Sequence, residues 1–408
     1  MFGSLLFSPR FPALTRRRPR RFWASLLASL SGGAALPLLL LAPNNAVAAV
    51  QQTPAPPRPA AAGATSAPRT TADPAFDAPS SGDDAKPGGP RDTVIFRGAA
   101  DLRARETDKE ADSSYLAAAR LTTDWVRRDV VSGRTQGGAR VKFYLENEGP
   151  RGTGARRLRP SEVYGTYEFR LPGVSATLKA GQFALPFGLT AVHDPLQIIQ
   201  PLYENSLGLR VDMGVMLEGE YAPYRYAVAL TTGAGPNRGD HDSNKMVTFR
   251  LERTLPTPYG RFTLGGSLLS GRGPLTTVDA QLPASGTSRV RQFVNKTRFG
   301  ADGQYEWNRL AARGEIVFGG DDEDPAWGYF AEGNFHATPR LTLVVMRRLW
   351  VFSDSIQIAS STGVGANYHF GDNFTLRALY EFQRDVPFPA GTAPRVAKRL
   401  TLQTRLNF

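Results

Sequence analysis

The chain has 408 residues, of which 41% are hydrophobic and 21% charged, with a formal net charge of +12 and no cysteine. Residues 1–91 hold ten basic and four acidic residues, which leaves 39 basic and 33 acidic residues in the rest of the chain. This mildly basic balance, with no stripe of Lys and Arg, argues against a nucleic-acid-binding protein. The lack of cysteine excludes disulfides, a thiol nucleophile and an N-terminal lipoprotein cysteine, and suits a chain that crosses an oxidising compartment.

The N-terminus has the features of a secretory signal peptide. A basic segment, 16–21, precedes an apolar segment, 22–41, which glycines and a proline interrupt. Ala46-Val47-Ala48 then forms a small-x-small cleavage site, so residues 1–48 are predicted to be a signal peptide. An uncleaved inner-membrane anchor is the alternative, but the interrupted apolar segment is marginal for a membrane-spanning helix.

Residues 49–91 are rich in Ala, Pro, Thr, Ser and Gly. Such a segment has too few apolar residues to bury a core, so we expect a disordered periplasmic linker. No segment after residue 50 approaches the ~18 consecutive apolar residues of a transmembrane helix. The remaining part, 92–408, therefore either folds in water or crosses a membrane as strands.

Beyond the linker, apolar and polar residues alternate: Val141, Phe143 and Leu145, for example, alternate with Lys142 and Tyr144. Successive side chains of a strand point to opposite faces, so the pattern predicts strands with one apolar and one polar face. A soluble β-sandwich alternates in the same way. Sixteen strands are predicted, at 94–104, 115–127, 137–147, 160–170, 173–183, 211–222, 223–233, 244–254, 259–271, 293–306, 308–319, 326–337, 340–351, 361–370, 373–383 and 397–408.

The lengths of the connections distinguish a membrane barrel from a sandwich. Connections after even-numbered strands are mostly tight, as at Ala222-Pro223, whereas those after odd-numbered strands are mostly long and polar, as at 184–210, 273–292 and 320–325. The connection 128–136 is an exception, because it is long for a periplasmic turn. Short turns at one end and long loops at the other are typical of bacterial outer-membrane barrels. We therefore expect an all-β fold, a transmembrane antiparallel up-and-down barrel of about sixteen strands with both ends in the periplasm.

The last strand closes this barrel. Leu400, Leu402, Leu406 and Phe408 lie on one face of it, and the chain stops on the aromatic residue. A barrel has no sheet edge, so this strand must pair with the first one. Phe408 is accordingly the predicted contact with the barrel-assembly machinery, and outer-membrane lipid is the other expected partner of the outer wall.

Electrostatics decide which face meets lipid, because a charged side chain at the bilayer midplane costs ~2–4 kcal/mol. The charged residues of the strands must therefore face a wet lumen, and about sixteen strands leave an aqueous channel. Aromatic residues near strand ends suit the two interfacial girdles; they are Tyr115, Trp125, Tyr221, Tyr224, Trp307, Trp327, Tyr329, Trp350, Tyr368 and Tyr380. The predicted pore-lining residues are Arg97, Arg140, Lys142, Lys179, Arg250, Arg298, Arg313, Arg377, Glu168, Asp212 and Glu218.

The third long connection, 184–210, is unusually apolar for a surface loop. A loop of this composition is better accommodated against the inside of the wall than in solvent, where it would narrow the lumen. The alternative is an external loop that covers the contact with a neighbouring subunit. The residues predicted to form the constriction are Pro186, Phe187, His193, Asp194, Glu204 and Arg210.

Two segments resemble a known family. Leu178–Leu189 is similar to the G-Q-x-x-x-P-F-G segment of the phosphate-selective porin O and P family, and Arg210–Val215 is similar to its Arg-x-x-Gly strand start. The resemblance implies a sixteen-stranded, often trimeric diffusion channel with an inward third loop. Phosphate specificity does not follow, because 184–210 lacks the basic cluster of the phosphate-selective members. A porin for small hydrophilic anionic or neutral solutes is expected, with a mild anion preference from the excess of basic residues.

Other functions have less support in the sequence. An outer-membrane lipase or protease needs an activated nucleophile, but the four histidines, His193, His241, His336 and His369, accompany no Gly-x-Ser-x-Gly motif, so no catalytic residue is predicted. The acidic segment 321–324 lacks the Gly and terminal Glu of a calcium loop and is predicted to be a solvated loop. No metal or cofactor is expected. A structural envelope tether, with a plugged barrel, is the remaining alternative.

Overall fold

The computed structural model describes residues 91–107, 114–129, 134–149, 156–171, 174–189, 197–202, 206–239, 243–275, 293–352, 357–386 and 395–408. The predicted signal peptide and nearly all of the predicted linker lie outside these residues. Sixteen strands are formed: β1 (Arg91–Thr107), β2 (Ser114–Arg128), β3 (Thr135–Gly149), β4 (Arg156–Leu171), β5 (Val174–Ala184), β6 (Val211–Tyr221), β7 (Tyr224–Thr231), β8 (Met246–Thr257), β9 (Gly260–Pro274), β10 (Phe293–Trp307), β11 (Leu310–Asp321), β12 (Asp324–His336), β13 (Leu341–Phe352), β14 (Gln357–Phe370), β15 (Phe374–Val386) and β16 (Arg395–Asn407). Among the described residues, no helix has the length and apolar character needed to cross a membrane.

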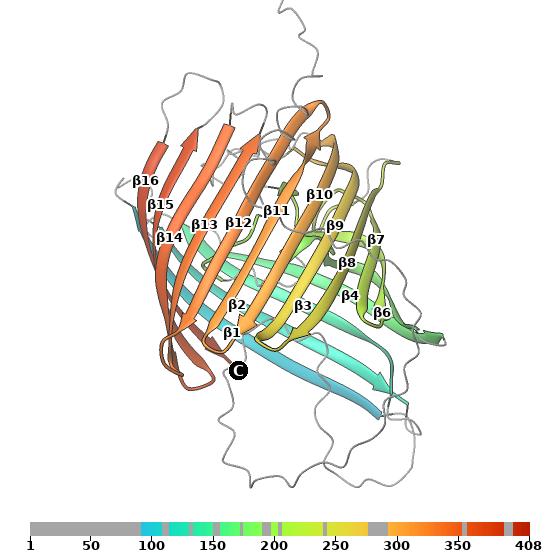
Figure 1. Ribbon diagram of the computed structural model, residues 1–408. Helices are drawn as coiled ribbons and strands as arrows, with labels where there is room; N and C mark the ends of the chain where they lie inside the picture. Colours follow the sequence, from blue (N-terminus) through green and yellow to red (C-terminus); the bar gives the residue numbers. More distant parts are fainter. Residues whose placement is uncertain are drawn as a thin grey trace, which may run out of the picture. The chain divides into compact units, whose positions relative to one another are not determined.

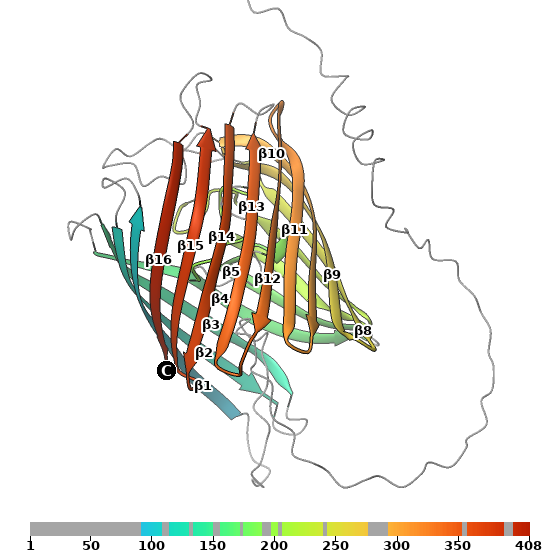
Figure 2. The same ribbon diagram turned by 60° about the vertical axis from the view of Figure 1, so that its left-hand side comes forward.

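The strands form one closed antiparallel barrel in which every strand pairs with its neighbours in sequence and β1 pairs with β16 (Figures 1 and 2). The predicted fold class and strand number are confirmed. Tight turns join even-numbered strands to the next strand, for example at residues 258–259 and 308–309. The connection between β2 and β3, residues 129–134, is longer, as the sequence predicts.

The connection between β11 and β12 corrects one prediction. Residues 320–325 were expected to form a long polar loop, but only Asp322 and Glu323 separate the two strands. Asp322 takes a left-handed backbone (φ 52°), a conformation that Asp tolerates and that tight hairpins require. Asp321 is the last residue of β11 and is buried, so it does not lie in a solvated loop. It forms ion pairs with Lys296 and Arg298 on β10, which explains the burial of its charge.

The two faces of the barrel wall differ as predicted. Large apolar side chains on the outer face are exposed, as Phe96 (67%) and Val345 (54%) show. Neighbouring residues on the inner face are polar or charged and are buried against one another, as are Asp101 and Arg405. An apolar outer wall and a polar inner wall are the arrangement of an outer-membrane barrel.

Most of the predicted girdle aromatics that the structure describes do lie on the outer face, among them Trp125, Tyr221 and Trp307. Trp350 was predicted to be one of them, and this is wrong. It lies on the inner face of β13, is 1% exposed, and its ring lies 5.6 Å from the guanidinium of Arg298. Its side chain is therefore part of the inner wall.

The C-terminal residue closes the seam between β1 and β16 at the end where β16 finishes. The backbone N–H of Gly98 donates to the carbonyl of Phe408 (2.7 Å), and the N–H of Phe408 donates to the carbonyl of Gly98 (3.0 Å). The Phe408 ring covers Gly98 so closely that a Cβ atom there would lie 2.1 Å from a ring carbon. The absence of a side chain at residue 98 therefore leaves room for the ring of Phe408 at this point of the wall.

We expect Gly98→Ala to lower the yield of folded barrel, because the methyl group displaces the Phe408 ring from the seam. The measurement is the fraction of protein that keeps heat-modifiable mobility in electrophoresis after refolding into detergent. Gly266→Ala is the matched control, since no atom lies within 4 Å of a Cβ built at Gly266. Equal yields for the two variants would contradict a role of this contact in closure.

Candidate functional site: the inner wall and the third connection

Charged residues of opposite sign meet on the inner wall, mostly across neighbouring strands. The registers place these partners opposite or diagonal to each other, so their side chains are within reach. The exception is Arg250 on β8, which reaches Asp302 on β10 across Gly265 of β9. The closest pairs are 2.5–2.9 Å apart. The pairs are Arg97–Asp124, Arg140–Asp124, Lys142–Glu162, Lys179–Glu218, Arg250–Asp302, Arg313–Glu332 and Arg405–Asp101. Most of the predicted lining charges are therefore neutralised locally.

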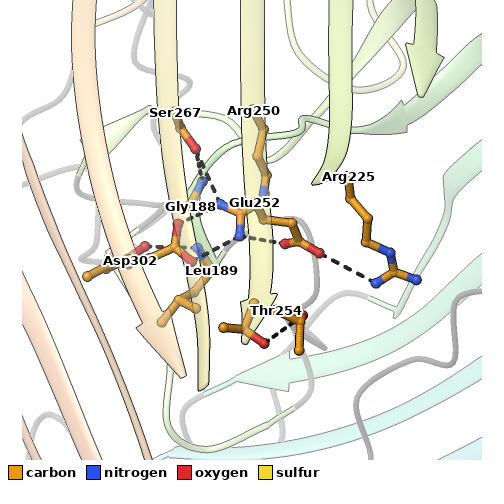
Figure 3. A network of polar contacts seen from close by, with 10 residues as sticks. Gly188, Leu189, Arg225, Arg250, Glu252, Thr254, Ser267 and Asp302 are labelled. Atoms are coloured by element: carbon orange, nitrogen blue, oxygen red, sulfur yellow. Dashed lines mark hydrogen bonds and ion pairs between the residues drawn. The ribbon is translucent and has the colours of Figure 1, made fainter. Parts of the chain in front are cut away.

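Figure 3 shows one of these networks, around Arg250. The guanidinium of Arg250 donates to both carboxylate oxygens of Asp302 (2.5 and 2.9 Å) and to Glu252 (3.0 Å). Glu252 in turn accepts a bond from Arg225 (3.4 Å), which also binds Glu220 (2.7 Å). Charge thus alternates in sign along this part of the wall, from β6 to β10.

The described residues of the third connection pack against the inside of the wall. The side chains of Leu185, Phe187 and Leu202 are at most 1% exposed. They belong to one apolar cluster with inward residues of β8, β9 and β11–β15, which include Met246, Leu269, Val317, Phe330, Val344, Met346, Trp350, Phe352 and Leu379. The connection therefore lies on an apolar area of a wall that is elsewhere charged.

Glu315 on β11 holds two points of this connection. Its Oε2 atom accepts the backbone N–H of Leu189 (3.0 Å), and its Oε1 atom accepts that of Leu202 (2.6 Å). Gly188, whose N–H donates to Ser267 Oγ (3.0 Å), has a left-handed backbone (φ 52°). A Cβ atom there would lie 2.6 Å from Glu315, so glycine allows this close approach. One buried carboxylate thus ties together two parts of the connection that are separated in sequence.

Arg298 holds the other end of the connection. Its Nε atom donates to the carbonyl of Ser206 (2.7 Å), and its Nη1 atom donates to the carbonyl of Gly320 (2.5 Å). The side chain has no exposed surface and is neutralised by Asp321, which Lys296 also contacts (2.9 Å). The carbonyl of Gln200 accepts a further bond from Arg348 (3.3 Å). Polar contacts from β9, β10, β11 and β13 therefore fix the described parts of the connection.

The predicted site residues fall into several environments. Asp212 is fully buried and accepts bonds from the backbone N–H groups of Gly233 and Gly235, so it fixes the start of the β7–β8 connection. Arg377 is buried and donates to Gln403 (3.5 Å). Glu168 is half-buried near the C-terminal end of β4. Pro186 and Phe187 are buried, and the carbonyl of Arg210 accepts the N–H of Leu185. The predicted residues His193, Asp194 and Glu204 lie outside the described residues.

Sequence reasoning missed the apolar area of the inner wall. Its clearest signal is in β13, where outward Leu343 and Val345 alternate with inward Val344 and Met346, so both faces of one strand are apolar. It also missed Ser267 and the special role of Glu315, which depend on contacts between distant segments. No group of three or more metal-binding side chains occurs among the residues that the structure describes.

The two described histidines have simple partners. His336 Nδ1 lies 2.9 Å from Thr342 Oγ1, and His369 Nδ1 lies 3.2 Å from Thr375 Oγ1. Each threonine lies on the strand next to its histidine. The imidazole rings are thus held in the wall by hydroxyl groups, and this pairing supplies no carboxylate to orient a catalytic base.

No protein-family model matches the chain, and no curated protein matches it in sequence. Solved structures share its fold. The outer membrane channel DcaP of Acinetobacter baumannii has 12% identity and a TM-score of 0.54, covering 78% of this chain and 97% of its own. The anion-selective porin from Comamonas acidovorans has 12% identity and a TM-score of 0.54, over 78% and 100%. OmpT of Vibrio cholerae, an outer membrane protein in trimer form, has 11% identity and a TM-score of 0.54, over 78% and 99%. The barrel therefore has the fold of outer-membrane channels.

Proposed function

We propose that the protein is an outer-membrane porin, a passive channel for small hydrophilic solutes. The observation that carries this proposal is the sorting of side chains in a closed sixteen-stranded ring, apolar outside and charged inside. A ring of this size leaves an aqueous channel. Its likeness to a porin and to an outer membrane channel supports the same function.

The third connection is the proposed constriction. The anchors at Glu315, Ser267 and Arg298 hold it against one side of the inner wall, where it takes up part of the lumen. In this proposal Arg298 and Asp212 act as supports for connections, since both are fully buried. Arg97, Arg140, Lys179, Arg313 and the other partly exposed charges line the passage.

Weak ion selectivity follows from the pairing of the wall charges. Each of the closest pairs cancels its own field at short range, and salt screens what is left beyond ~10 Å at 0.1 M. We propose a mild anion preference from the small excess of basic residues. The resemblance to phosphate-selective porins does not extend to a basic cluster, so phosphate selectivity is not proposed.

The test is solute uptake by liposomes that contain the refolded protein. Swelling in isotonic solutions of uncharged sugars is expected for small sugars and should stop as the sugar becomes larger. Protein-free liposomes and liposomes with heat-denatured protein are the controls. Failure to swell in the smallest sugar would contradict the porin proposal and favour a plugged barrel that serves as an envelope tether.

The pair formed by Lys179 and Glu218 (2.7 Å) provides a test of selectivity, because Glu218 is 36% exposed and Lys179 is 15% exposed. Glu218→Gln should shift the reversal potential in asymmetric KCl towards anion preference, since it leaves the lysine uncompensated. Lys179→Gln should shift it towards cation preference. Shifts of the same sign in both variants would contradict the assignment of this pair to the passage.

We also propose a location, an oligomeric state and the lack of an enzymatic activity for this protein. The barrel would lie in the outer membrane, with the linker in the periplasm and Phe408 read by the assembly machinery. A homotrimer is proposed from the resemblance to trimeric porins, in keeping with the trimer form of one structural neighbour. No enzymatic activity is proposed, because each described histidine is paired with threonine rather than with a serine nucleophile and an acid.

A further inference from the structure

One charged residue breaks the apolar pattern of the outer wall. Arg347 is exposed on β13, and its outward neighbours on the same strand include Val345. It lies six residues from the start of the strand and five from its end. A transmembrane strand needs about 9–11 residues, so any such span within this 12-residue strand includes Arg347. The Cα atom of Arg347 therefore lies on the part of the wall that faces the hydrocarbon region.

Outward charges such as Asp92, Glu106 and Arg127 lie one residue from a strand end. Arg253 lies four residues from the end of β8, but it has an aromatic partner beside a turn: it lies opposite Tyr224, the first residue of β7, and its guanidinium is 5.4 Å from that ring. Arg347 instead lies opposite Ala331 and Thr362, which are both in the middle of their strands. Because a charge on the lipid-facing wall is unfavourable, its position calls for an anionic partner.

Arg347 belongs to a polar patch on β13–β16. Arg347 donates to the hydroxyl of Thr362 on β14. Two residues earlier on the same face of β14 is Ser360, which lies opposite Arg384 on β15. Lys398 on β16 lies diagonal to Arg384, which pairs with Val396. Arg347, Arg384 and Lys398 are all exposed. We call Arg347, Ser360, Thr362, Arg384 and Lys398 the outer basic patch.

The patch extends from mid-strand towards one end of the barrel. Arg384 lies two residues before the end of β15 and Lys398 three residues after the start of β16, beside the connection 387–394. With both ends of the barrel in the periplasm, as proposed, the connections after odd-numbered strands face the outside of the cell. The nearest outward acid across the seam is Glu106, opposite Leu400 and so beside Lys398. Arg347 and Arg384 lie on the far side of the patch from this acid.

We propose that the outer basic patch binds the phosphate of a lipid headgroup in the outer leaflet. Arginine binds phosphate through two parallel hydrogen bonds, and its long stem lets the guanidinium reach from the apolar wall towards the headgroup level. Exposed Val345, Val364 and Phe382 flank the patch and would contact the acyl chains. The inference rests on the proposed position of the barrel in the outer membrane.

A second copy of the chain fits the patch less well. Outward acidic residues of the described strands lie at strand ends, as Asp92 and Glu106 do, so the outer wall of another copy offers no carboxylate at the depth of Arg347. A phosphorylated lipid supplies the missing negative charge and is present all around the barrel. Charge complementarity therefore favours lipid over a second protein surface at this place.

The test is native mass spectrometry of the full-length refolded protein, titrated with bisphosphorylated lipid A. The wild type should bind it at least about tenfold more tightly than Arg347→Ala/Arg384→Ala, a difference of about 1.4 kcal/mol. Arg127→Ala/Arg253→Ala is the matched control, since it also removes two outward cations, near the opposite end of the barrel. That control should bind like the wild type, and dephosphorylated lipid A should bind all three proteins equally weakly.

Equal binding of lipid A by the wild type and by Arg347→Ala/Arg384→Ala would overturn the inference. So would a wild type that binds dephosphorylated lipid A just as tightly. An oligomer that forms without lipid and dissociates in Arg347→Ala/Arg384→Ala would instead assign the patch to a second copy. Liposome swelling with the same preparations separates the two proposals. If the barrel is permeable but does not bind lipid A, the lipid site alone is refuted. If the barrel binds lipid A but is impermeable, the channel alone is refuted.

Discussion

Glu315→Ala is expected to raise single-channel conductance by about twofold or more, because the sixteen-stranded ring is wider than the passage left beside the third connection. Glu315 accepts the N–H groups of Leu189 and Leu202, and alanine removes both bonds. Each hydrogen bond of this kind contributes about 0.5–1.5 kcal/mol. Their loss should release the connection from β11, so the current should also become noisier.

Planar-bilayer recording measures this effect. Glu332→Ala is the matched control: Glu332 is an inward carboxylate on the neighbouring strand, but it binds Arg313 (2.7 Å) and Asn334 (2.8 Å). The control should change selectivity more than conductance. If Glu315→Ala conducts like the wild type while Glu332→Ala conducts more, the constriction does not depend on the Glu315 anchor.

Asp101→Ala should destabilise the folded barrel by about 3–5 kcal/mol, since it removes the carboxylate that binds a buried cation at the seam. Asp101 accepts bonds from Arg405 (2.9 and 3.2 Å) and from Gln403 (2.6 Å) across the β1–β16 seam. The side chains of Asp101 and Arg405 are 0% and 4% exposed, so the pair is shielded from solvent. The barrel is expected to open first at this seam.

The measurement is the midpoint of guanidinium unfolding in detergent micelles. Arg261→Ala is the control, because its pair with Glu306 is exposed on both sides and such pairs contribute about 0–1 kcal/mol. Asp101→Leu should recover part of the loss only when Arg405→Met is also introduced. A midpoint for Asp101→Ala equal to that of Arg261→Ala would show that the seam does not depend on this pair.

The fold was largely predictable because each strand carries its own local signal. Alternation such as that of Val141, Lys142 and Phe143 needs no knowledge of distant residues, and it predicted both the number of strands and the inward charges. Closure by Phe408 followed from the same pattern. The apolar composition of 184–210 predicted an inward third loop, and the family resemblance implies the same.

The details of the site were less predictable because they depend on register. Asp321 looked like part of an acidic loop, yet its burial is stabilised by Lys296 and Arg298, more than twenty residues earlier in the chain. Trp350 looked like a girdle residue. It is five residues, an odd number, from outward Val345 on the same strand, and this spacing places it on the inner face. The sequence showed that charged residues face inward, but it did not show which of them pair with each other.

Current block at engineered cysteines tests most directly that solutes pass through the inside of this barrel. The chain has no cysteine, so Asn334→Cys on the inner face and Phe335→Cys on the outer face each provide a single thiol. A charged, membrane-impermeant thiol reagent should lower the current of open Asn334→Cys channels in steps and leave Phe335→Cys unchanged. A stepwise block at Phe335→Cys with none at Asn334→Cys would contradict the account.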